Sequence, residues 1–374
     1  MEKKLKNIVV TSVFITFIAF FVVMCGVCYF NPAESSDAER RPLAQFPDKI
    51  TWSGLVDKTV IDAFEDYSVD QFPFREFFRG IKARFQFGIL GLKENNGLAV
   101  EDGYIVKIEQ EFNDKNVEFS LGKLSAFYDR FIKDNGGRHF ISLIPDKNYF
   151  FGKDYGYPAP DYEWLNEQVT STFPGMTYID IYNALELEDY YRTDTHWSQD
   201  KILGVADKLA AGMGISDLLS GQYKENRLEG FQGVYYGQSA LKPKPDTLVY
   251  LTNDVLDACT VYDYAKNTTG SIYNFDLFGG KDGYDFFLSG TRPLLRIDNP
   301  NSTSGKTLVV FRDSYGSSLT PLLVEAYDTI YVVDIRYIDA NSLSMYEKMK
   351  MVDFEGADVL FIYSALIINS VSFK

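Results

Sequence analysis

The stretch at residues 308–318 reads LVVFRDSYGSS. Its apolar start predicts a buried strand over residues 307–311, and its polar end predicts a turn into a helix. In open parallel sheets, ligands bind at the carboxyl ends of the strands, which is where Asp313 and Ser314 would lie. Helix capping explains a serine such as Ser317 in this turn, but it explains Asp313 followed by Ser314 less well.

Strands and helices alternate around this stretch. Further strands are predicted at residues 139–144, 177–181, 330–334 and 359–363. Helices are predicted at residues 121–133, 199–213, 319–326 and 342–351. The alternation predicts an α/β fold with a parallel sheet flanked by helices. Residues 220–300 break the rhythm because they are rich in Gly, Tyr, Asp and Asn, and they predict an irregular or β-rich insertion.

The composition excludes several classes of function. The chain has 374 residues and a formal net charge of −15, which argues against binding nucleic acid along a basic surface. Three cysteines and two histidines argue against both a disulfide framework and a zinc site. We therefore predict no metal and no cofactor.

The N-terminus carries a candidate membrane segment. Residues 8–30 form a run of 23 without a charge, and a helix of that length spans about 34 Å, enough for a bilayer core of about 30 Å. Lys3, Lys4 and Lys6 precede the run, so the C-terminal bulk is predicted to lie outside the cytoplasm. A cleaved signal peptide is the alternative, but the small-residue cleavage pattern is missing. We therefore predict an uncleaved anchor.

The sequence divides into three parts. Residues 1–30 are the cytoplasmic tip and anchor, residues 31–57 form a proline-containing tether, and residues 58–374 form the extracytoplasmic domain. Within this domain, one apolar set has helical spacing, and we expect it to face the core. Its members are Phe74, Phe77, Phe78, Ile81 and Phe85.

A second stretch, at residues 191–198, reads YRTDTHWS. Asp194 stands two residues before His196, and at this spacing in a turn its carboxylate can reach the ring and fix the tautomer. The other ring nitrogen is then free to act as a base. The alternative is a surface histidine near a helix start, with Asp194 serving the helix N-terminus.

Together the two stretches supply the side chains of a serine triad. Ser314 would be the nucleophile, His196 the base and Asp194 the orienting acid. The backbone amide of Ser314, with that of Tyr315 or Gly316, is a candidate for stabilising an oxyanion.

Two basic residues near strand ends are further candidates for contacting substrate. Lys147 follows the strand that stops at Pro145, and it would contact substrate or neutralise Asp146. Arg312 would bind a sugar carboxylate or balance local acidic charge, and the structural role is favoured for it.

Five short motifs of the chain resemble a known family. They are residues 41–43 (RPL), 70–75 (DQFPFR), 145–147 (PDK), 194–197 (DTHW) and 313–315 (DSY). They resemble the bacterial DHHW family, which is similar to the SGNH-hydrolase-like domain of periplasmic alginate O-acetyltransferases. The resemblance implies an SGNH-like fold with Asp194, His196 and Ser314 as the triad. The chain departs from the pattern at Thr195, where the family name implies a second histidine.

Three functions fit these residues. The first is an O-acyltransferase, O-acetyl by the resemblance, that modifies a secreted or cell-wall polysaccharide through an acyl-serine. The second is a carbohydrate esterase with the same triad and water as the acceptor. The third is a non-catalytic scaffold for polysaccharide assembly that keeps the fold. The complete set of three triad residues favours the two enzymes.

The predicted location adds a partner to the first function. Acetyl-CoA is cytoplasmic, so an enzyme outside the membrane needs a partner that passes acyl groups across. The resemblance implies a multi-pass membrane-bound O-acyltransferase for this step. The location would be a bacterial cell envelope, and sparse cysteine would suit a Gram-positive bacterium.

Overall fold

The computed structural model describes residues 2–374, with side chains from residue 4 onward. These residues form two compact units. The N-terminal unit comprises residues 2–95 and 236–242, and the sheet unit comprises residues 96–235 and 243–374. The structure therefore groups residues 58–95 with the N-terminal part, while the tether over residues 31–57 stays a prediction.

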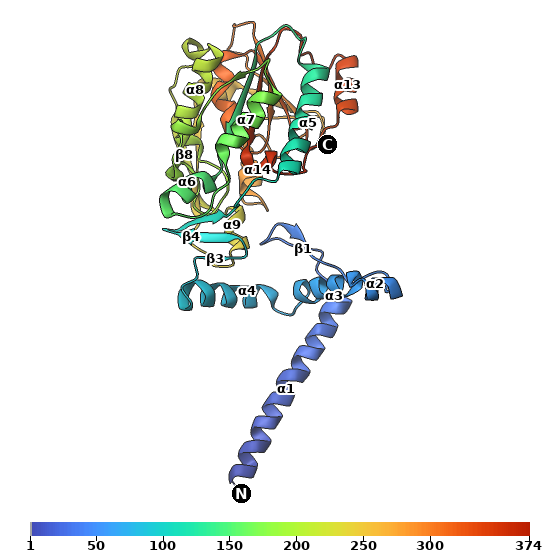
Figure 1. The fold of residues 1–374 in the computed structure, drawn as a ribbon. Helices are drawn as coiled ribbons and strands as arrows, with labels where there is room; N and C mark the ends of the chain where they lie inside the picture. Colours follow the sequence, from blue (N-terminus) through green and yellow to red (C-terminus); the bar gives the residue numbers. More distant parts are fainter. Residues whose placement is uncertain (1) are drawn as a thin grey trace. The chain divides into compact units, whose positions relative to one another are not determined.

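The N-terminal unit is mainly helical (Figure 1). Its elements are α1 (Glu2–Phe30), β1 (Ser35–Ser36), β2 (Arg41–Pro42), α2 (Trp52–Val56), α3 (Thr59–Asp70), α4 (Arg75–Arg84), the π-helical turn η1 (Phe85–Ile89) and β3 (Glu94–Asn95). The part of α1 over Lys4–Phe30 is long and apolar enough to cross a membrane. This helix is compatible with the predicted anchor over residues 8–30.

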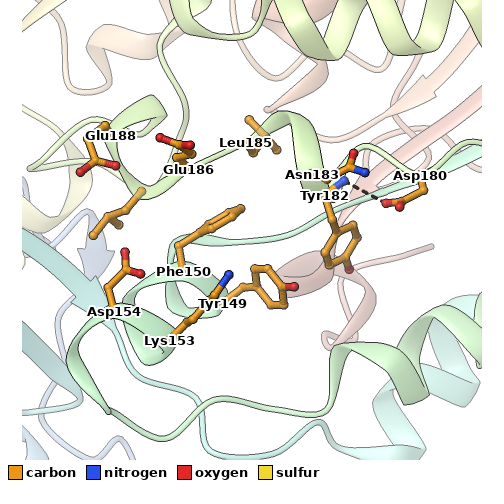
Figure 2. Close-up of a pocket in the computed structure, with 11 residues that line it drawn as sticks. Tyr149, Phe150, Lys153, Asp154, Asp180, Tyr182, Asn183, Leu185, Glu186 and Glu188 are labelled. Atoms are coloured by element: carbon orange, nitrogen blue, oxygen red, sulfur yellow. Dashed lines mark hydrogen bonds between the residues drawn. The ribbon is translucent and has the colours of Figure 1, made fainter.

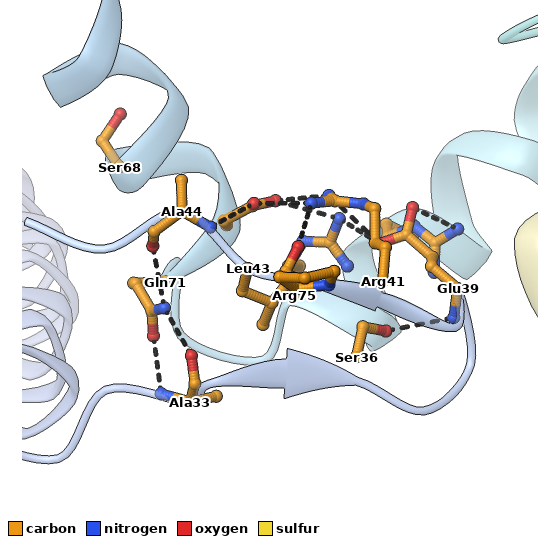
Figure 3. Close-up of polar contacts among 12 residues, drawn as sticks. Ala33, Ser36, Glu39, Arg41, Leu43, Ala44, Ser68, Gln71 and Arg75 are labelled. Atoms are coloured by element: carbon orange, nitrogen blue, oxygen red, sulfur yellow. Dashed lines mark hydrogen bonds and ion pairs between the residues drawn. The ribbon is translucent and has the colours of Figure 1, made fainter. Parts of the chain in front are cut away.

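A polar network joins the β1–β2 pair to the turn after α3 (Figure 3). Asp70 accepts two hydrogen bonds from the Arg41 guanidinium, at 2.8 and 2.6 Å, and one from the amide of Ala44 at 2.9 Å. The hydrogen bonds from Arg41 lower the pKa of Asp70 to about 2. Gln71 bonds to both backbone groups of Ala33 and to the carbonyl of Ala44. The motif at residues 70–75 therefore has a structural role in this unit.

The apolar stripe of α4 faces outward, so the expectation that it faces the core is wrong. Phe77 is 65% exposed and Phe74 is 51% exposed. Ala83, which is fully buried, lies on the inward face instead. Arg75 and Arg79 are largely buried as well, and both pair with Glu39. Helical spacing predicts which side chains share a face, but it does not predict what covers that face.

The sheet unit contains an eight-stranded sheet in the order β11-β10-β12-β14-β13-β15-β6-β7. In chain order these strands are β6 (His139–Ile144), β7 (Thr177–Tyr178), β10 (Thr260–Asp263), β11 (Thr268–Gly270), β12 (Leu294–Asp298), β13 (Thr307–Arg312), β14 (Thr329–Val333) and β15 (Asp358–Ser364). The five strands from β14 to β7 pair in parallel. The strand predicted over residues 177–181 is present only as the short β7.

The fold class is confirmed as a large sheet flanked by helices, but the sheet is mixed rather than all parallel. The predicted insertion supplies β10, β11 and β12, which pair antiparallel with one another and with β14. Only residues 264–267 connect β10 to β11, and so short a connection allows antiparallel pairing alone. The insertion also contains a separate antiparallel pair, β8 (Lys224–Phe231) with β9 (Asp246–Thr252).

Alternate residues of the sheet enter two apolar cores. Leu308 and Val310 of β13 pack on one face together with α8, while Val309 and Phe311 pack on the other with α5, α7 and α13. These helices are α5 (Asp114–Phe131), α7 (Tyr162–Thr172), α8 (Leu203–Met213) and α13 (Ala340–Lys348). Burial on both faces is typical of parallel strands. The two cores hold these strands in place, and with them the strand ends where the candidate site lies.

The remaining elements are short. They are β4 (Leu98–Glu101), β5 (Tyr104–Lys107), α6 (Lys147–Tyr155), η2 (Tyr182–Ala184), η3 (Leu187–Asp189), η4 (Gln199–Lys201), η5 (Ser216–Leu218), α9 (Val234–Gln238), α10 (Asp254–Ala258), α11 (Phe275–Phe278), η6 (Gly283–Phe286), α12 (Gly316–Leu319), η7 (Thr320–Ala326) and α14 (Ala365–Ile368). The β4–β5 hairpin turns at Asp102 and Gly103, which both have positive φ, as a tight two-residue turn requires.

Candidate active site

The turn after β13 places Ser314 at the carboxyl end of the sheet. Asp313 is fully buried, and its carboxylate accepts hydrogen bonds from the amide of Tyr315 at 3.0 Å and from the amide and hydroxyl of Ser364 at 2.8 and 2.6 Å. Since Ser364 ends the neighbouring strand β15, Asp313 fixes the turn to the sheet. Ser314 is partly exposed, whereas every other residue from 308 to 324 is buried.

A closed loop carries Asp194 and His196. Tyr190 and Trp197 form an antiparallel bridge, and the amide of Tyr191 donates to the carbonyl of His196 at 3.0 Å. Inside the loop, Asp194 Oδ1 accepts from the amide of His196 at 2.9 Å and pairs with its Nδ1 at 2.5 Å. The loop therefore fixes both the position and the orientation of the imidazole.

The structure brings Asp194, His196 and Ser314 together. His196 Nε2 lies 2.7 Å from Ser314 Oγ, and the opposite ring nitrogen faces Asp194. When Nδ1 donates its proton to Asp194, Nε2 is left as an acceptor for the serine hydroxyl. The catalytic roles of these residues stay predictions, but their geometry is that of a nucleophile, a base and an orienting acid.

Asp194 is held in its ionised form. It is fully buried, which by itself would raise the pKa of its carboxyl, but attraction to His196 and hydrogen bonds from the His196 ring and amide outweigh burial. The amide of Val234 adds a bond to Oδ2 at 2.7 Å. The net result is a pKa below the ordinary value for aspartate, so the carboxylate remains an acceptor at neutral pH.

The ring of Tyr284 holds the histidine against the helix after Ser314, and Trp197 ties its own backbone neighbour to the same helix. The ring of Tyr284 stacks on His196, with centroids 3.9 Å apart and planes 5° apart. The Tyr284 hydroxyl lies 2.7 Å from Ser318 Oγ, and Trp197 Nε1 donates to the same oxygen at 2.9 Å. Tyr284 comes from the insertion, and no feature of the sequence indicated that it packs on His196.

Lys147 lies beneath the Asp194 loop rather than beside Ser314. Its side chain is buried, and Nζ donates to the carbonyls of Ile105, Tyr191 and Asp194 at 2.7, 2.8 and 2.9 Å. A longer bond reaches the carbonyl of Arg192 at 3.2 Å. Burial lowers the pKa of Lys147 to about 7. With every donor directed at backbone carbonyls, Lys147 supports the loop, and its predicted contact with substrate stays a prediction.

The other predicted substrate contacts are also engaged within the fold. The amide of Tyr315 donates to Asp313 Oδ1, and the amide of Gly316 donates to the carbonyl of Asp313 at 3.1 Å. Arg312 is fully buried and bonds to the carbonyl of Gly290 at 3.1 Å. Among the residues that the structure describes, the amide of Ser314 makes no hydrogen bond, which leaves it as the candidate donor to an oxyanion.

Gly233 allows a close approach that the site requires. A Cβ built on Gly233 would lie 2.3 Å from Asp194 Cβ and 2.4 Å from the carbonyl of Thr193. The missing side chain lets the next amide, that of Val234, reach Asp194 Oδ2. This role has no signal in the sequence, because residues 194 and 233 are brought together only by the fold.

Gly233→Ala is expected to displace the Asp194 loop and to destabilise the chain by about 1–3 kcal/mol, as overpacking typically does. Thermal unfolding and esterase activity on p-nitrophenyl acetate measure the two effects. Gly122→Ala is the matched control, because its Cβ would meet nothing within 4 Å on the exposed side of α5. A Gly233→Ala variant as stable and active as the Gly122→Ala variant would contradict this role.

A hollow of about 580 Å³ lies elsewhere on the sheet unit, beside α6 (Figure 2). Its lining combines the rings of Tyr149 and Tyr182 with the carboxylates of Asp154, Glu186 and Glu188. None of the three triad candidates lines it. We therefore place the candidate active site at Ser314 and not in this hollow.

The sheet and the site at its strand ends define an SGNH-hydrolase-like α/β domain. Residues 175–333 match the family model described as DHHW protein. The predicted resemblance to the DHHW family is thereby confirmed, and the matched segment includes all three triad candidates. No curated protein matches the chain.

Solved structures share the fold of this chain. A DHHW family protein from Eubacterium siraeum is 22% identical, with a TM-score of 0.59 over 74% of this chain and 93% of that chain. PatB1 of Bacillus cereus is 18% identical, with a TM-score of 0.56 over 75% of this chain and 99% of that chain. PatB1 has also been solved with a sulfonyl adduct. At these identities, the likeness is one of fold.

Proposed function

We propose that the chain is a membrane-anchored, extracytoplasmic serine O-acyltransferase that transfers an acetyl group to a secreted or cell-wall polysaccharide. The observation that carries the proposal is the 2.7 Å separation of Ser314 Oγ and His196 Nε2, with Asp194 bonded to the opposite ring nitrogen. A serine hydroxyl is a weak nucleophile at neutral pH, and it needs such a base to attack an ester or thioester.

The first half of the reaction forms an acyl-serine. Ser314 Oγ attacks the carbonyl carbon of the acyl donor as His196 Nε2 takes the hydroxyl proton. The amide of Ser314 donates to the oxygen on which negative charge develops. The tetrahedral intermediate then expels the donor's leaving group, which receives the proton from His196, and the acetyl group stays on Ser314.

The second half transfers the acetyl group to the acceptor. His196 removes the proton from a sugar hydroxyl, whose oxygen attacks the acyl-serine carbonyl, and Ser314 leaves with the same proton. An esterase would differ only in using water at this step. The resemblance of residues 194–197 and 313–315 to the alginate O-acetyltransferase domain supports transfer to a sugar hydroxyl.

The test is to trap the acyl-enzyme on the full-length chain in detergent. After incubation with p-nitrophenyl acetate, intact mass and peptide mapping are expected to show one acetyl adduct, about 42 Da, on Ser314. Ser314→Ala and His196→Ala are expected to lose the adduct. Ser317→Ala is the matched control, because this buried serine lies one turn further along and its Oγ has no partner among the described residues. An adduct on another residue, or none, would contradict the assignment of Ser314.

A second measurement separates transfer from hydrolysis. The trapped acetyl-enzyme is mixed with an oligosaccharide acceptor or with buffer alone, and its decay is followed by mass. Transfer predicts faster decay with the acceptor and an acetylated sugar as the product. Decay at the same rate to free acetate in both samples would favour the esterase.

An extracytoplasmic acetyltransferase also needs a source of acetyl groups. We propose a multi-pass membrane-bound O-acyltransferase as the partner that passes them across the membrane. Affinity purification of the full-length chain from its native membranes is expected to recover such a protein. Recovery of the chain without any multi-pass protein would count against this partner.

A further inference from the structure

The N-terminal unit presents a broad apolar surface that its described residues leave largely exposed. We call six of its side chains the outer apolar face: Phe74, Phe77, Phe78, Ile81, Phe85 and Ile89. Their exposed fractions run from 39% to 72%. Phe74 directly precedes α4, and the other five come from α4 and the adjoining turn η1. Contiguous exposed apolar surface of this kind marks a site for a membrane or a partner.

This surface is continuous with the candidate membrane helix. The ring of Phe20 lies 6.0 Å from that of Phe74, and the ring of Phe21 lies 5.8 Å from Phe72 and 6.3 Å from Phe78. Figure 1 shows α3 at the upper end of α1 and α4 to one side of it. Residues 4–20 of α1 are exposed, and partial burial begins only at Phe21.

Phe20 and Phe21, which make these contacts, lie on the part of α1 that would be inside a bilayer. From Ile8, where the uncharged run begins, to Phe21 is about 20 Å at 1.5 Å per residue. A hydrocarbon core of about 30 Å that starts at Ile8 therefore extends about 10 Å past Phe21. The turn at Phe72–Phe74 and the start of the outer apolar face then lie within the outer leaflet.

The charges of α4 also fit a position at the membrane surface. Its sequence REFFRGIKAR carries four basic residues and one acidic residue. Arg75 and Arg79 turn inward to Glu39, while Lys82 and Arg84 are exposed next to the apolar stripe. Helices that lie in a membrane interface combine a phenylalanine-rich face with basic residues, whose long side chains reach the headgroups.

We propose that the outer apolar face lies in the outer leaflet of the membrane that α1 crosses, with Lys82 and Arg84 at anionic phospholipid headgroups. The N-terminal unit is then held by one spanning helix and one interfacial helix. The ion pairs of Glu39 and Asp70 keep α4 fixed to the rest of the unit. The proposal does not depend on the acyltransferase assignment.

Depth measurement on the full-length chain tests the proposal. The protein carries Cys25→Ala and Cys28→Ala, keeps the buried Cys259, and is reconstituted in vesicles of phosphatidylethanolamine and phosphatidylglycerol. A nitroxide is placed at Phe77→Cys, or at Ile89→Cys as a second position. Glu118→Cys, on the exposed side of α5, is the control. Collision rates with oxygen and with a water-soluble nickel chelate give the depth of each label.

The labels at Phe77→Cys and Ile89→Cys are expected to favour oxygen over the nickel chelate and to lie about 5–10 Å below the phosphate level. The Glu118→Cys label is expected to favour the nickel chelate. Nickel access at positions 77 and 89 equal to that at position 118 would overturn the proposal. Labels shielded from both reagents would also overturn it, because they would indicate a protein partner or a second copy on this face.

Discussion

Asp194→Asn is expected to lower kcat for acetyl transfer to Ser314 by about 10⁴-fold, the effect that loss of the orienting carboxylate has in serine triads. The physical reason is the tautomer of His196. An asparagine amide that donates to Nδ1 forces the ring proton onto Nε2, which then faces Ser314 Oγ as a donor. Without an acceptor at Nε2, the serine proton has no base to receive it.

The measurement is the rate of the acetyl adduct on Ser314, followed by intact mass at pH 7, together with thermal unfolding. The Asp194→Asn variant is expected to form the adduct slowly, whereas Ser314→Ala forms none. Asp217→Asn, at an exposed position of η5, is the control for a change of charge alone. An Asp194→Asn variant within tenfold of the native rate would show that Asp194 does not orient the base.

The three triad candidates could be predicted from sequence because each depends on local order. Asp194 and His196 are two residues apart, and Ser314 follows a strand whose apolar pattern is unambiguous. The support around them could not be predicted. Tyr284 lies 88 residues after His196 and Val234 lies 38 residues after it, and no short-range pattern encodes such distant contacts.

The fold shows the same division between local and distant information. Strands buried on both faces, such as β13 and β15, have uninterrupted apolar runs and were predicted closely. The antiparallel strands β10 and β12 are short and partly exposed, so their pattern predicted only an irregular or β-rich insertion and not the individual strands. The stripe of α4 was correctly assigned to a helix, but it was assigned to the wrong environment, since a core and a membrane select the same side chains.

Lys147→Met is expected to destabilise the chain by about 3 kcal/mol and to lower the rate of adduct formation, because buried carbonyls that lose their donor cost about 1–3 kcal/mol each. Nζ is the shared donor for the carbonyls of Ile105, Tyr191 and Asp194. Methionine keeps most of the apolar volume of lysine, so the lost hydrogen bonds and charge dominate. Lys153→Met, on the exposed side of the same helix α6, is the matched control.

The dependence of stability on pH tests whether burial lowers the pKa of Lys147. Burial lowers the pKa of Lys147 to about 7 in the folded chain, against 10.5 as its ordinary value. Between these two pH values the unfolded chain keeps a proton that the folded chain has lost, so Lys147 makes the free energy of unfolding rise with pH. The free energy of unfolding of the native protein is therefore expected to rise more steeply with pH than that of Lys147→Met, by up to about 1.4 kcal/mol per pH unit. Denaturant titrations at pH 7, 8.5 and 10 measure the slope in each protein. Equal slopes would contradict the lowered pKa. They would show that the surrounding carbonyls offset the burial of Lys147.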